Sequence, residues 1–189
     1  MQLTKESMTD KSSLRRTLLA ARNSFSAELR ARMDAALVAR VLDWAARHPP
    51  KLLGVYWPIR GEPDLRAAYA TLQKRGVQLA LPAVDGADQP LRFLLWTPDS
   101  VLEKDRMGVM APAAGTFVQP DALLIPCVGW NATHHRLGYG GGFYDRTLAA
   151  LPRPLAIGIA YASARCVFDN APHDQALDAV ITESTESTD

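Results

Sequence analysis

The sequence has little of what marks a disulfide-rich, zinc-binding or strongly charged protein. Its 189 residues include only two cysteines, Cys127 and Cys166, which lie far apart and in neither CxxC nor Cys/His metal spacing. This argues against a disulfide framework and a zinc site, and it favours a reducing compartment. Lysine plus arginine number 21 and aspartate plus glutamate 20, so no bulk positive field draws the chain to nucleic acid or to an anionic membrane. Any anion site must be local.

Long apolar runs are also missing. The densest apolar stretch, 123–130, is interrupted by Pro126 and Gly129 and falls well short of the roughly 18 apolar residues that a membrane span needs. The first ten residues are polar and lack the apolar core of a secretory signal. We therefore expect a soluble, cytoplasmic protein with one compact domain over residues 1–189 and flexible ends at 1–10 and 184–189.

Hydrophobic periodicity predicts two helices followed by an alternation of strands and helices. Apolar residues recur at three- and four-residue spacing through 11–22 and 29–44, as in helices, and Pro49 and Pro50 end the second one. The remaining predicted elements are helices at 64–75 and 144–151 and strands at 52–56, 77–81, 91–95, 122–125, 155–161 and 179–182.

Several of these predicted strands are nearly all apolar instead of alternating, as a sheet covered on both faces requires. Strand, helix, strand is also the unit of a parallel sheet. The sequence thus predicts an α/β protein with three α/β/α layers and a mostly parallel sheet. Segments 83–90 and 97–121 are rich in proline, glycine and aspartate, so we predict loops there.

The most informative segment is Arg136-Leu-Gly-Tyr-Gly-Gly-Gly-Phe-Tyr-Asp-Arg146. Four glycines within five residues are costly in backbone entropy, which suggests that the main chain turns sharply there or comes close to a ligand. Backbone amides ahead of a helix form a phosphate cradle, Arg136 can pair with phosphate, and Asp145 can hold magnesium. The spacing matches neither Walker A nor the dinucleotide fingerprint. The alternative is a flexible connection with exposed glycines.

This segment and three others resemble the 5-formyltetrahydrofolate cyclo-ligase family over the chain from Lys11 to about Glu183. The central family signature ends in Arg-Leu-Gly-x-Gly-x-Gly-aromatic-Tyr-Asp-Arg, and this chain is similar to it from Pro126 through Arg146. The other matching motifs are Lys11-Ser-Ser-Leu-Arg15, Tyr56-Trp-Pro58 followed by Gly61-Glu-Pro63, and His173-Asp174 followed by Leu177-Asp-Ala-Val180.

The resemblance implies a sheet of the sugar-phosphate isomerase and CoA-transferase type. It also implies that ATP and Mg²⁺ serve to convert 5-formyltetrahydrofolate to 5,10-methenyltetrahydrofolate, with release of ADP and phosphate. In that reaction the formyl oxygen is phosphorylated and N10 then closes the ring. Reduced folate and ATP are the implied partners. We expect a monomer, with a weak dimer as the alternative, and a protein that binds neither nucleic acid nor membrane.

The resemblance also implies roles for individual residues. Lys11 and Arg136 are the implied catalytic residues, and Asp145 and Asp174 the implied magnesium ligands. The implied ATP-binding residues are Lys11, Ser12, Ser13, Leu14, Arg15, Arg136, Leu137, Gly138, Tyr139, Gly140, Gly141, Gly142, Phe143 and Tyr144. Those implied for the folate are Trp57, Glu62, Tyr139, Gly140, Gly141, Gly142, Phe143 and Tyr144.

Several of these residues have a plainer interpretation. Lys11 and Arg15 are four residues apart on a predicted helix, where a solvated charged face is common. Asp145 and Asp174 are also suited to cap a helix or a turn. Glu62 stands in a turn before a predicted helix, where the helix dipole favours an acid regardless of function. Its functional interpretation is also chemically apt, because a carboxylate can accept the adjacent N–H donors of a pterin together.

The chain departs from the family pattern at three places. Trp130-Asn131 stands where the family usually has Phe-Asp, and Met107 and Ala111 stand in place of an aromatic residue and a glutamate. These changes leave open a non-catalytic relative that binds nucleotide or folate. The arginine-rich N-terminal helices leave open an RNA- or protein-interaction module, although no stacking platform or known nucleic-acid motif accompanies them.

Overall fold

The structure is a computed structural model that describes residues 10–105 and 108–184. The helices are α1 (Lys11–Asn23), α2 (Ala27–Arg47), α3 (Arg66–Lys74), α4 (Phe143–Ala149) and the short 3-10 helix η1 (Ala162–Ala164). The strands are β1 (Leu52–Gly54), β2 (Gln78–Ala83), β3 (Arg92–Trp96), β4 (Leu102–Lys104), β5 (Met110–Pro112), β6 (Phe117–Val118), β7 (Ala122–Pro126), β8 (Gly129–Trp130), β9 (Arg136–Leu137), β10 (Leu155–Ile159) and β11 (Ala179–Ile181). The predicted flexible ends lie almost wholly outside the described residues.

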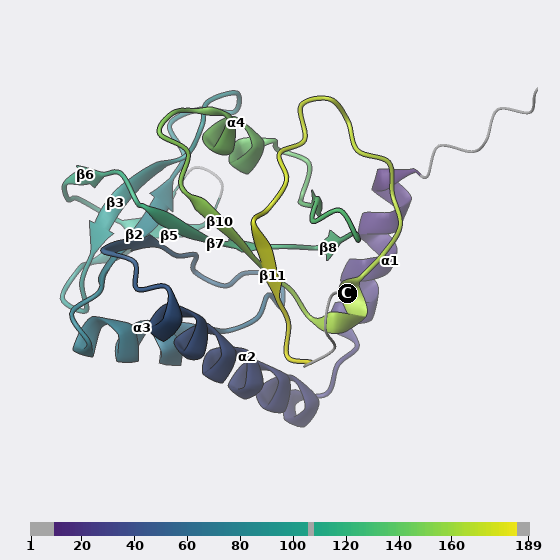
Figure 1. Ribbon diagram of the computed structural model, residues 1–189, viewed down its shortest axis with the longest axis horizontal. Helices are drawn as coiled ribbons and strands as arrows, with labels where there is room; N and C mark the ends of the chain where they lie inside the picture. Colours follow the sequence, from purple (N-terminus) through teal and green to yellow (C-terminus); the bar gives the residue numbers. More distant parts are fainter. Residues whose placement is uncertain (1–9, 106–107, 185–189) are drawn as a thin grey trace, which may run out of the picture.

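The main sheet has seven strands in the order β11-β10-β7-β1-β2-β3-β6. The five strands from β11 to β2 run parallel, whereas β3 is antiparallel to β2 and β6 antiparallel to β3. Helices α2 and α3 cover one face and α4 lies over the other, with α1 at the end of the sheet near β8 (Figure 1). The predicted α/β architecture with a mostly parallel sheet is confirmed.

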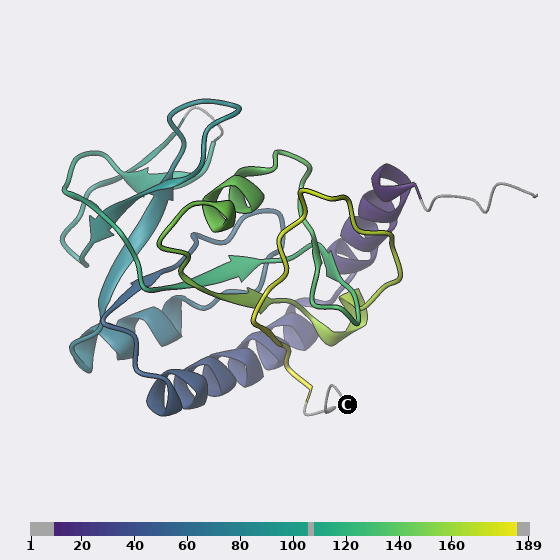
Figure 2. The same ribbon diagram turned by 45° about the horizontal axis from the view of Figure 1, so that its top comes forward.

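Each face of the sheet has its own hydrophobic core, because successive side chains of a strand point to opposite faces. Leu79 and Leu81 of β2 pack in the cluster that contains α2 and α3, while Ala80 packs in the cluster that contains Leu148 of α4. The sheet is therefore buried on both sides (Figure 2), which explains the nearly continuous apolar runs in its strands.

The prediction of a loop throughout 97–121 is wrong in part. Strands β4 and β5 pair as a small antiparallel sheet, and β6 pairs with β3 at the edge of the main sheet. These strands are two or three residues long, too short to show a period, and they lie among prolines and glycines. Their structure depends on pairing with distant residues and not on local preference.

The other predicted elements differ from the structure mainly at their ends. The strand predicted to reach residue 161 ends at Ile159, and the helix predicted from residue 64 begins at Arg66. Asp64 stands before that helix, and its side chain accepts a hydrogen bond from the Arg66 N–H at 3.1 Å. The short β8–β9 hairpin, which no pattern predicted, leads directly into the glycine-rich segment.

Candidate functional site

One face of α1 directs three cationic side chains toward the predicted site. Lys11, Arg15 and Arg22 are four and seven residues apart, so they share a face of the helix. Between them, Leu18 packs against Gly129 of β8, where an added Cβ would come within 2.7 Å of the Leu18 side chain. Glycine at 129 thus lets α1 approach closely enough for its cations to reach the segments beside it.

The first of these cations, Lys11, is paired with a predicted metal ligand. Its Nζ lies 2.7 Å from Asp174 Oδ2, which also accepts the Ala171 N–H at 2.8 Å. Burial acts to raise the pKa of Asp174, but the hydrogen bonds from Lys11 and Ala171 outweigh it, and the pKa lies below its ordinary value. Asp174 is therefore a carboxylate at neutral pH. The structure brings the two sequence motifs at 11–15 and 173–174 together.

Arg136 makes a second ion pair, with the other predicted metal ligand, Asp145. Its Nη2 lies 2.7 Å from Asp145 Oδ1, and its Nη1 donates to Gln175 O at 2.9 Å. The Gln175 N–H donates back to Asp145 Oδ1 at 3.0 Å. The Arg136 side chain is only 5% exposed, so it holds Asp145 and residue 175 in place from within the structure.

Residues 138–142, which we call the glycine loop, join β9 to α4. Gly140 and Gly142 have φ of 98° and 67°, a left-handed region that strongly favours glycine. Arg15 Nε donates to Gly138 O at 2.7 Å, and Arg146 Nη2 donates to Gly141 O at 2.7 Å. Within residues 10–105 and 108–184, no acceptor takes a hydrogen bond from the backbone N–H groups of the loop. The loop thus directs its carbonyls to arginines and leaves its amide donors available.

Arg146 fastens the glycine loop to the predicted loop at 83–90. The guanidinium that donates to Gly141 also donates to Ala87 O at 2.8 Å and to Gln89 O at 3.2 Å. Next to it, Thr147 Oγ1 accepts the Leu91 N–H at 2.9 Å. Sequence reasoning did not include Arg146 in the site, although it closes the glycine-rich signature.

A hydrogen-bonded chain links α1, the glycine loop and the predicted folate carboxylate. Arg22 Nη2 donates to the Tyr139 hydroxyl at 2.6 Å, and that hydroxyl donates to Glu62 Oε1 at 2.9 Å. Glu62 Oε2 accepts the Ile59 N–H at 2.9 Å, and Arg22 also donates to Arg60 O at 3.0 Å. Sequence reasoning missed Arg22, but its spacing of seven residues from Arg15 is a signal that could have found it.

Glu62 is 5% exposed and its acid–base behaviour is altered accordingly. Burial raises the pKa of this carboxyl to about 7, while the Ile59 N–H, the Tyr139 hydroxyl and the charges of Arg22 and Arg60 act in the opposite direction. Both protonation states of Glu62 are therefore populated near neutral pH.

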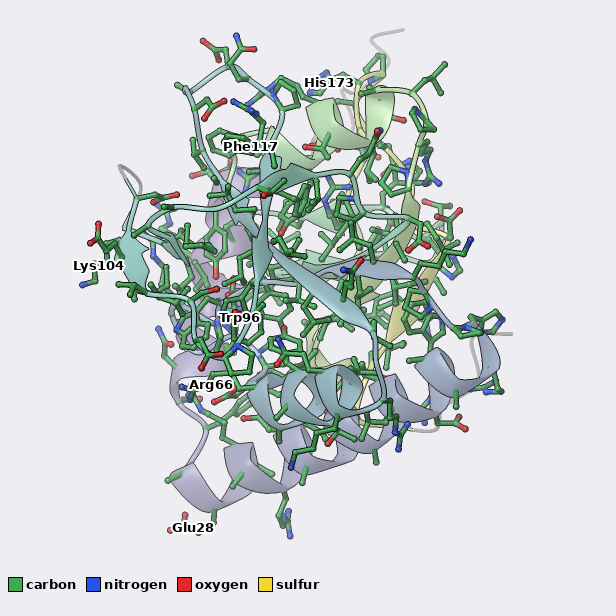
Figure 3. All side chains as sticks on the ribbon, turned by 90° about the vertical axis from the view of Figure 1, so that its left-hand side faces the viewer. Glu28, Arg66, Trp96, Lys104, Phe117 and His173 are labelled. Atoms are coloured by element: carbon green, nitrogen blue, oxygen red, sulfur yellow. The ribbon has the colours of Figure 1, made fainter. Side chains whose placement is uncertain are left out.

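The predicted aromatic residues divide into two groups. Tyr144 and Phe143 lie beside the arginines of the loop region, with the guanidinium of Arg136 5.8 Å from the first ring and that of Arg146 5.1 Å from the second. Trp57 lies instead next to Trp96 and Arg66, at 5.9 Å and 5.4 Å. Arg66 is the first residue of α3, and Figure 3 labels both partners. Among the described residues, no hydrogen bond or ring contact joins Trp57 to the glycine loop.

Asn131, where the resembling family usually has aspartate, organises the turn between β8 and β9. Its Oδ1 accepts from the Thr133 N–H and hydroxyl and from the His135 N–H. Its Nδ2 donates to Asn170 Oδ1 at 3.0 Å and to Phe168 O at 3.4 Å. A carboxylate at 131 has no donor for the last two contacts. The amide therefore gives this chain hydrogen bonds to residues 168 and 170, and it lacks the negative charge of an aspartate. Met107, the second departure, lies outside the described residues.

A magnesium ion fits this region only together with ligands from another molecule. Within the part of the chain that the structure describes, no cluster of three or more His, Cys, Asp or Glu side chains could hold a metal. Asp145 of α4 and the segment that carries Asp174 nevertheless meet, since Asp145 accepts the N–H of Gln175, the residue that follows Asp174. Mg²⁺ is commonly held by one or two carboxylates plus phosphate oxygens and water. The donor set suits an ion that arrives with a nucleotide.

A cavity of about 370 Å³ lies elsewhere, between α4 and the β3–β6 edge of the sheet where Figure 3 marks Phe117. It is lined mainly by apolar residues, such as Phe93, Leu123 and Pro152, and its described lining includes none of the predicted site residues. The charged and hydrogen-bonding side chains predicted for the site lie around the glycine loop, so we place the candidate site there.

Known proteins resemble the chain over nearly its whole length. The sequence profile of the 5-formyltetrahydrofolate cyclo-ligase family matches residues 7–183. A 5-formyltetrahydrofolate cyclo-ligase of Mycoplasma genitalium is 27% identical over 178 residues, 92% of this chain and 98% of its own. Structures of 5,10-methenyltetrahydrofolate synthetases superpose with TM-scores of 0.78 (Mycoplasma pneumoniae, 26% identity, 93% of this chain and 100% of that one) and 0.80 (Aquifex aeolicus, 29%, 93% and 90%).

The fold and these matches define an enzyme, an ATP-dependent ligase built on an α/β sheet. The chain belongs to the 5-formyltetrahydrofolate cyclo-ligase family. The resemblance inferred from its motifs is confirmed. In the described residues, no helix is long and apolar enough to cross a membrane.

Proposed function

We propose that this chain converts 5-formyltetrahydrofolate to 5,10-methenyltetrahydrofolate at the expense of ATP, with Mg²⁺ as cofactor and ADP and phosphate as the other products. The observation that carries the proposal is the glycine loop. Its amide donors are unused among the described residues, and it lies between the cationic face of α1 and the carboxylate of Asp145. Its setting suits a triphosphate, because backbone amides and fixed cations both stabilise phosphate charge.

The ATP phosphates are assigned to the glycine loop and its cationic neighbours. Lys11 and Arg15 reach this region from α1, and Arg136 of β9 lies next to it, where one of its guanidinium nitrogens pairs with Asp145. The full assignment is residues 11–15 and 136–144. Lys11 and Arg136 are the proposed catalytic cations, since phosphoryl transfer depends chiefly on positioning and on stabilising charge.

The folate is assigned to the side of the loop that faces Glu62. The carboxylate accepts N–H groups of the pterin, and Trp57, Phe143 and Tyr144 are assigned to stack on the aromatic rings of the folate. Tyr139 and the glycines that follow it lie between the two substrates, as required when the formyl oxygen must meet the γ-phosphoryl group.

The chemistry consists of two displacements. The formyl oxygen attacks the γ-phosphorus, and the bond from that phosphorus to the β,γ-bridging oxygen breaks to release ADP. The N10 nitrogen then attacks the formyl carbon, loses its proton, and expels the former formyl oxygen with the phosphate. Neither step needs a covalent bond to the protein, so the residues bind, orient and neutralise charge.

Mg²⁺ would be held by Asp145 and Asp174 and would neutralise negative charge on the triphosphate. The two carboxylates are already oriented, by Arg136 and by Lys11. We further propose that the chain acts as a single domain and a monomer in the cytoplasm, where its two free cysteines stay reduced.

The test follows the absorbance of the methenyl product with 5-formyltetrahydrofolate, ATP and Mg²⁺. Lys11→Met should lower kcat by about 100-fold, as removal of one charge-stabilising donor commonly does. Lys51→Met, which removes an exposed lysine outside the site, is the matched control and should match the wild type. Binding of folate and ATP without product would establish the non-catalytic relative instead. With an ¹⁸O-labelled formyl group, the label should appear in phosphate.

A further inference from the structure

The Tyr139 hydroxyl is hydrogen-bonded to Glu62, the carboxylate that is proposed to bind the pterin. It donates to Glu62 Oε1 at 2.9 Å, while the other oxygen of Glu62 is taken by the Ile59 N–H. The guanidinium of Arg60 lies 5.3 Å from the centre of the tyrosine ring. With Glu62 only 5% exposed, a ligand reaches the carboxylate only if a neighbouring side chain gives way.

The turn that carries Glu62 is the fixed side of this contact. The Glu62 N–H donates to Ile59 O at 2.9 Å and the Glu62 side chain accepts from the Ile59 N–H, so the turn is closed in both directions. Arg60 and Gly61 have φ of 48° and 72°, which commits the turn to an uncommon backbone conformation. A change on this side would break several contacts at once.

The glycine loop is the side that can move. Tyr139 stands between Gly138, around whose Cβ position the described residues leave open space, and Gly140, whose φ of 98° is accessible chiefly to glycine. Within the described residues, the Tyr139 hydroxyl donates to Glu62 and accepts from Arg22. Arg22 Nη2 also donates to Arg60 O at 3.0 Å, so this nitrogen keeps an acceptor when the phenol departs.

We propose that the Tyr139 phenol sets the folate affinity of this chain by competing with the pterin for Glu62. The inference rests on the proposed function, in which Glu62 binds the pterin. In the free protein the phenol satisfies the buried carboxylate; when folate binds, its N–H groups replace the phenol and Tyr139 swings away on its glycine neighbours. Tyr139 is thus an affinity-determining residue whose hydroxyl weakens folate binding.

The experiment titrates 5-formyltetrahydrofolate into the full chain by calorimetry, without ATP, so that no chemistry intervenes. Tyr139→Phe keeps the ring and removes the competing hydrogen bond, and it should lower the Kd by about tenfold, the effect of one hydrogen bond to a charged group.

Tyr161→Phe is the matched control, because the Tyr161 hydroxyl likewise donates to a carboxylate, Asp34 Oδ1 at 2.7 Å, outside the proposed site. It should leave the folate Kd unchanged. Tyr139→Met, which also lacks the hydroxyl, should shift the folate Kd in the same direction as Tyr139→Phe.

Both Tyr139 variants are first shown to be folded by a cooperative thermal melt. If the folate Kd of either variant is then unchanged or higher than that of the wild type, the inference is overturned. The proposed function still stands in that case, provided that the wild type binds folate and forms product. Wild-type protein that neither binds folate nor forms product removes the proposed function, and the inference with it.

Discussion

At the scale of single residues, burial changes the chemistry of Glu62 most. The carboxyl has a pKa of about 7 in the folded chain, above the ordinary value of 4.5. Between these two values the folded chain binds more protons than the unfolded chain, so the free energy of unfolding falls as pH rises through this window. The hydrogen bonds from Tyr139 and Ile59 reduce the free-energy cost of burying the ionised Glu62 carboxylate without removing it.

Glu62→Gln should remove this pH dependence, because the amide does not titrate. From about pH 4.5 to pH 8 the free energy of unfolding of the variant, relative to wild type, should rise by on the order of 3 kcal/mol. Urea denaturation of both proteins at pH 5 and pH 8 measures the difference. Glu103→Gln, at an exposed carboxyl of β4, is the control. A constant offset between Glu62→Gln and wild type across this range would show that Glu62 titrates in the same range whether the chain is folded or not.

At the scale of elements, α1 is the helix that presents cations to the proposed nucleotide site. Its first turn is held by Asp10, whose side chain accepts the N–H groups of Ser12 and Ser13 at 3.0 Å and 3.1 Å. Lys11 follows the cap directly and Arg15 lies one turn later. The cap therefore controls the order of the part of α1 that is proposed to contact phosphates.

Asp10→Ala should cost about 1 kcal/mol in stability and raise the KM for ATP several-fold, with the KM for folate unchanged. Ser26→Ala is the matched control, because Ser26 caps α2 by accepting the Leu29 N–H at 3.1 Å, and no predicted site residue lies on α2. The control should lose similar stability without a change in either KM. If both variants changed KM alike, the effect of Asp10 would come from general destabilisation. Initial rates over a range of each substrate decide between these outcomes.

At the scale of the whole molecule, the candidate site is assembled from four separate stretches of chain around the sheet: 11–22, 57–62, 136–145 and 173–175. No stretch forms the site alone, and each contact between them exists only in the folded chain. A ligand that binds this assembly stabilises the native state relative to the unfolded chain. The Lys11–Asp174 pair, which joins residues 163 positions apart, is one such contact.

ATP with Mg²⁺ at about 100 times its Kd should therefore raise the free energy of unfolding by about 2.7 kcal/mol. Thermal melts with and without the nucleotide, and with EDTA in place of Mg²⁺, measure the shift. Asp145→Asn should reduce the part that depends on Mg²⁺ and keep the part that does not, because the amide retains hydrogen bonding but loses the charge. A shift unaffected by EDTA in the wild type would contradict the assignment of the metal.

The sequence by itself determined the class of fold and the family. Apolar runs with flanking turns were enough for the central strands, and helical periodicity was enough for α2 and α3, because both depend on burial of residues close in sequence. The motif around the glycine loop was enough for the family, since four glycines and an arginine at fixed spacing are rare without a common function.

Only the tertiary structure decided which side chains meet. The pairing of Arg22 with Tyr139 and Glu62, the burial of Arg136 against Asp145, and the use of Asn131 as a tie to Asn170 all join residues from different elements. The short strands β4, β5 and β6 likewise exist through their partners. Local sequence specifies which residues favour a helix or strand, but the distance between two side chains depends on how the whole sheet packs, and so do their burial and pKa values.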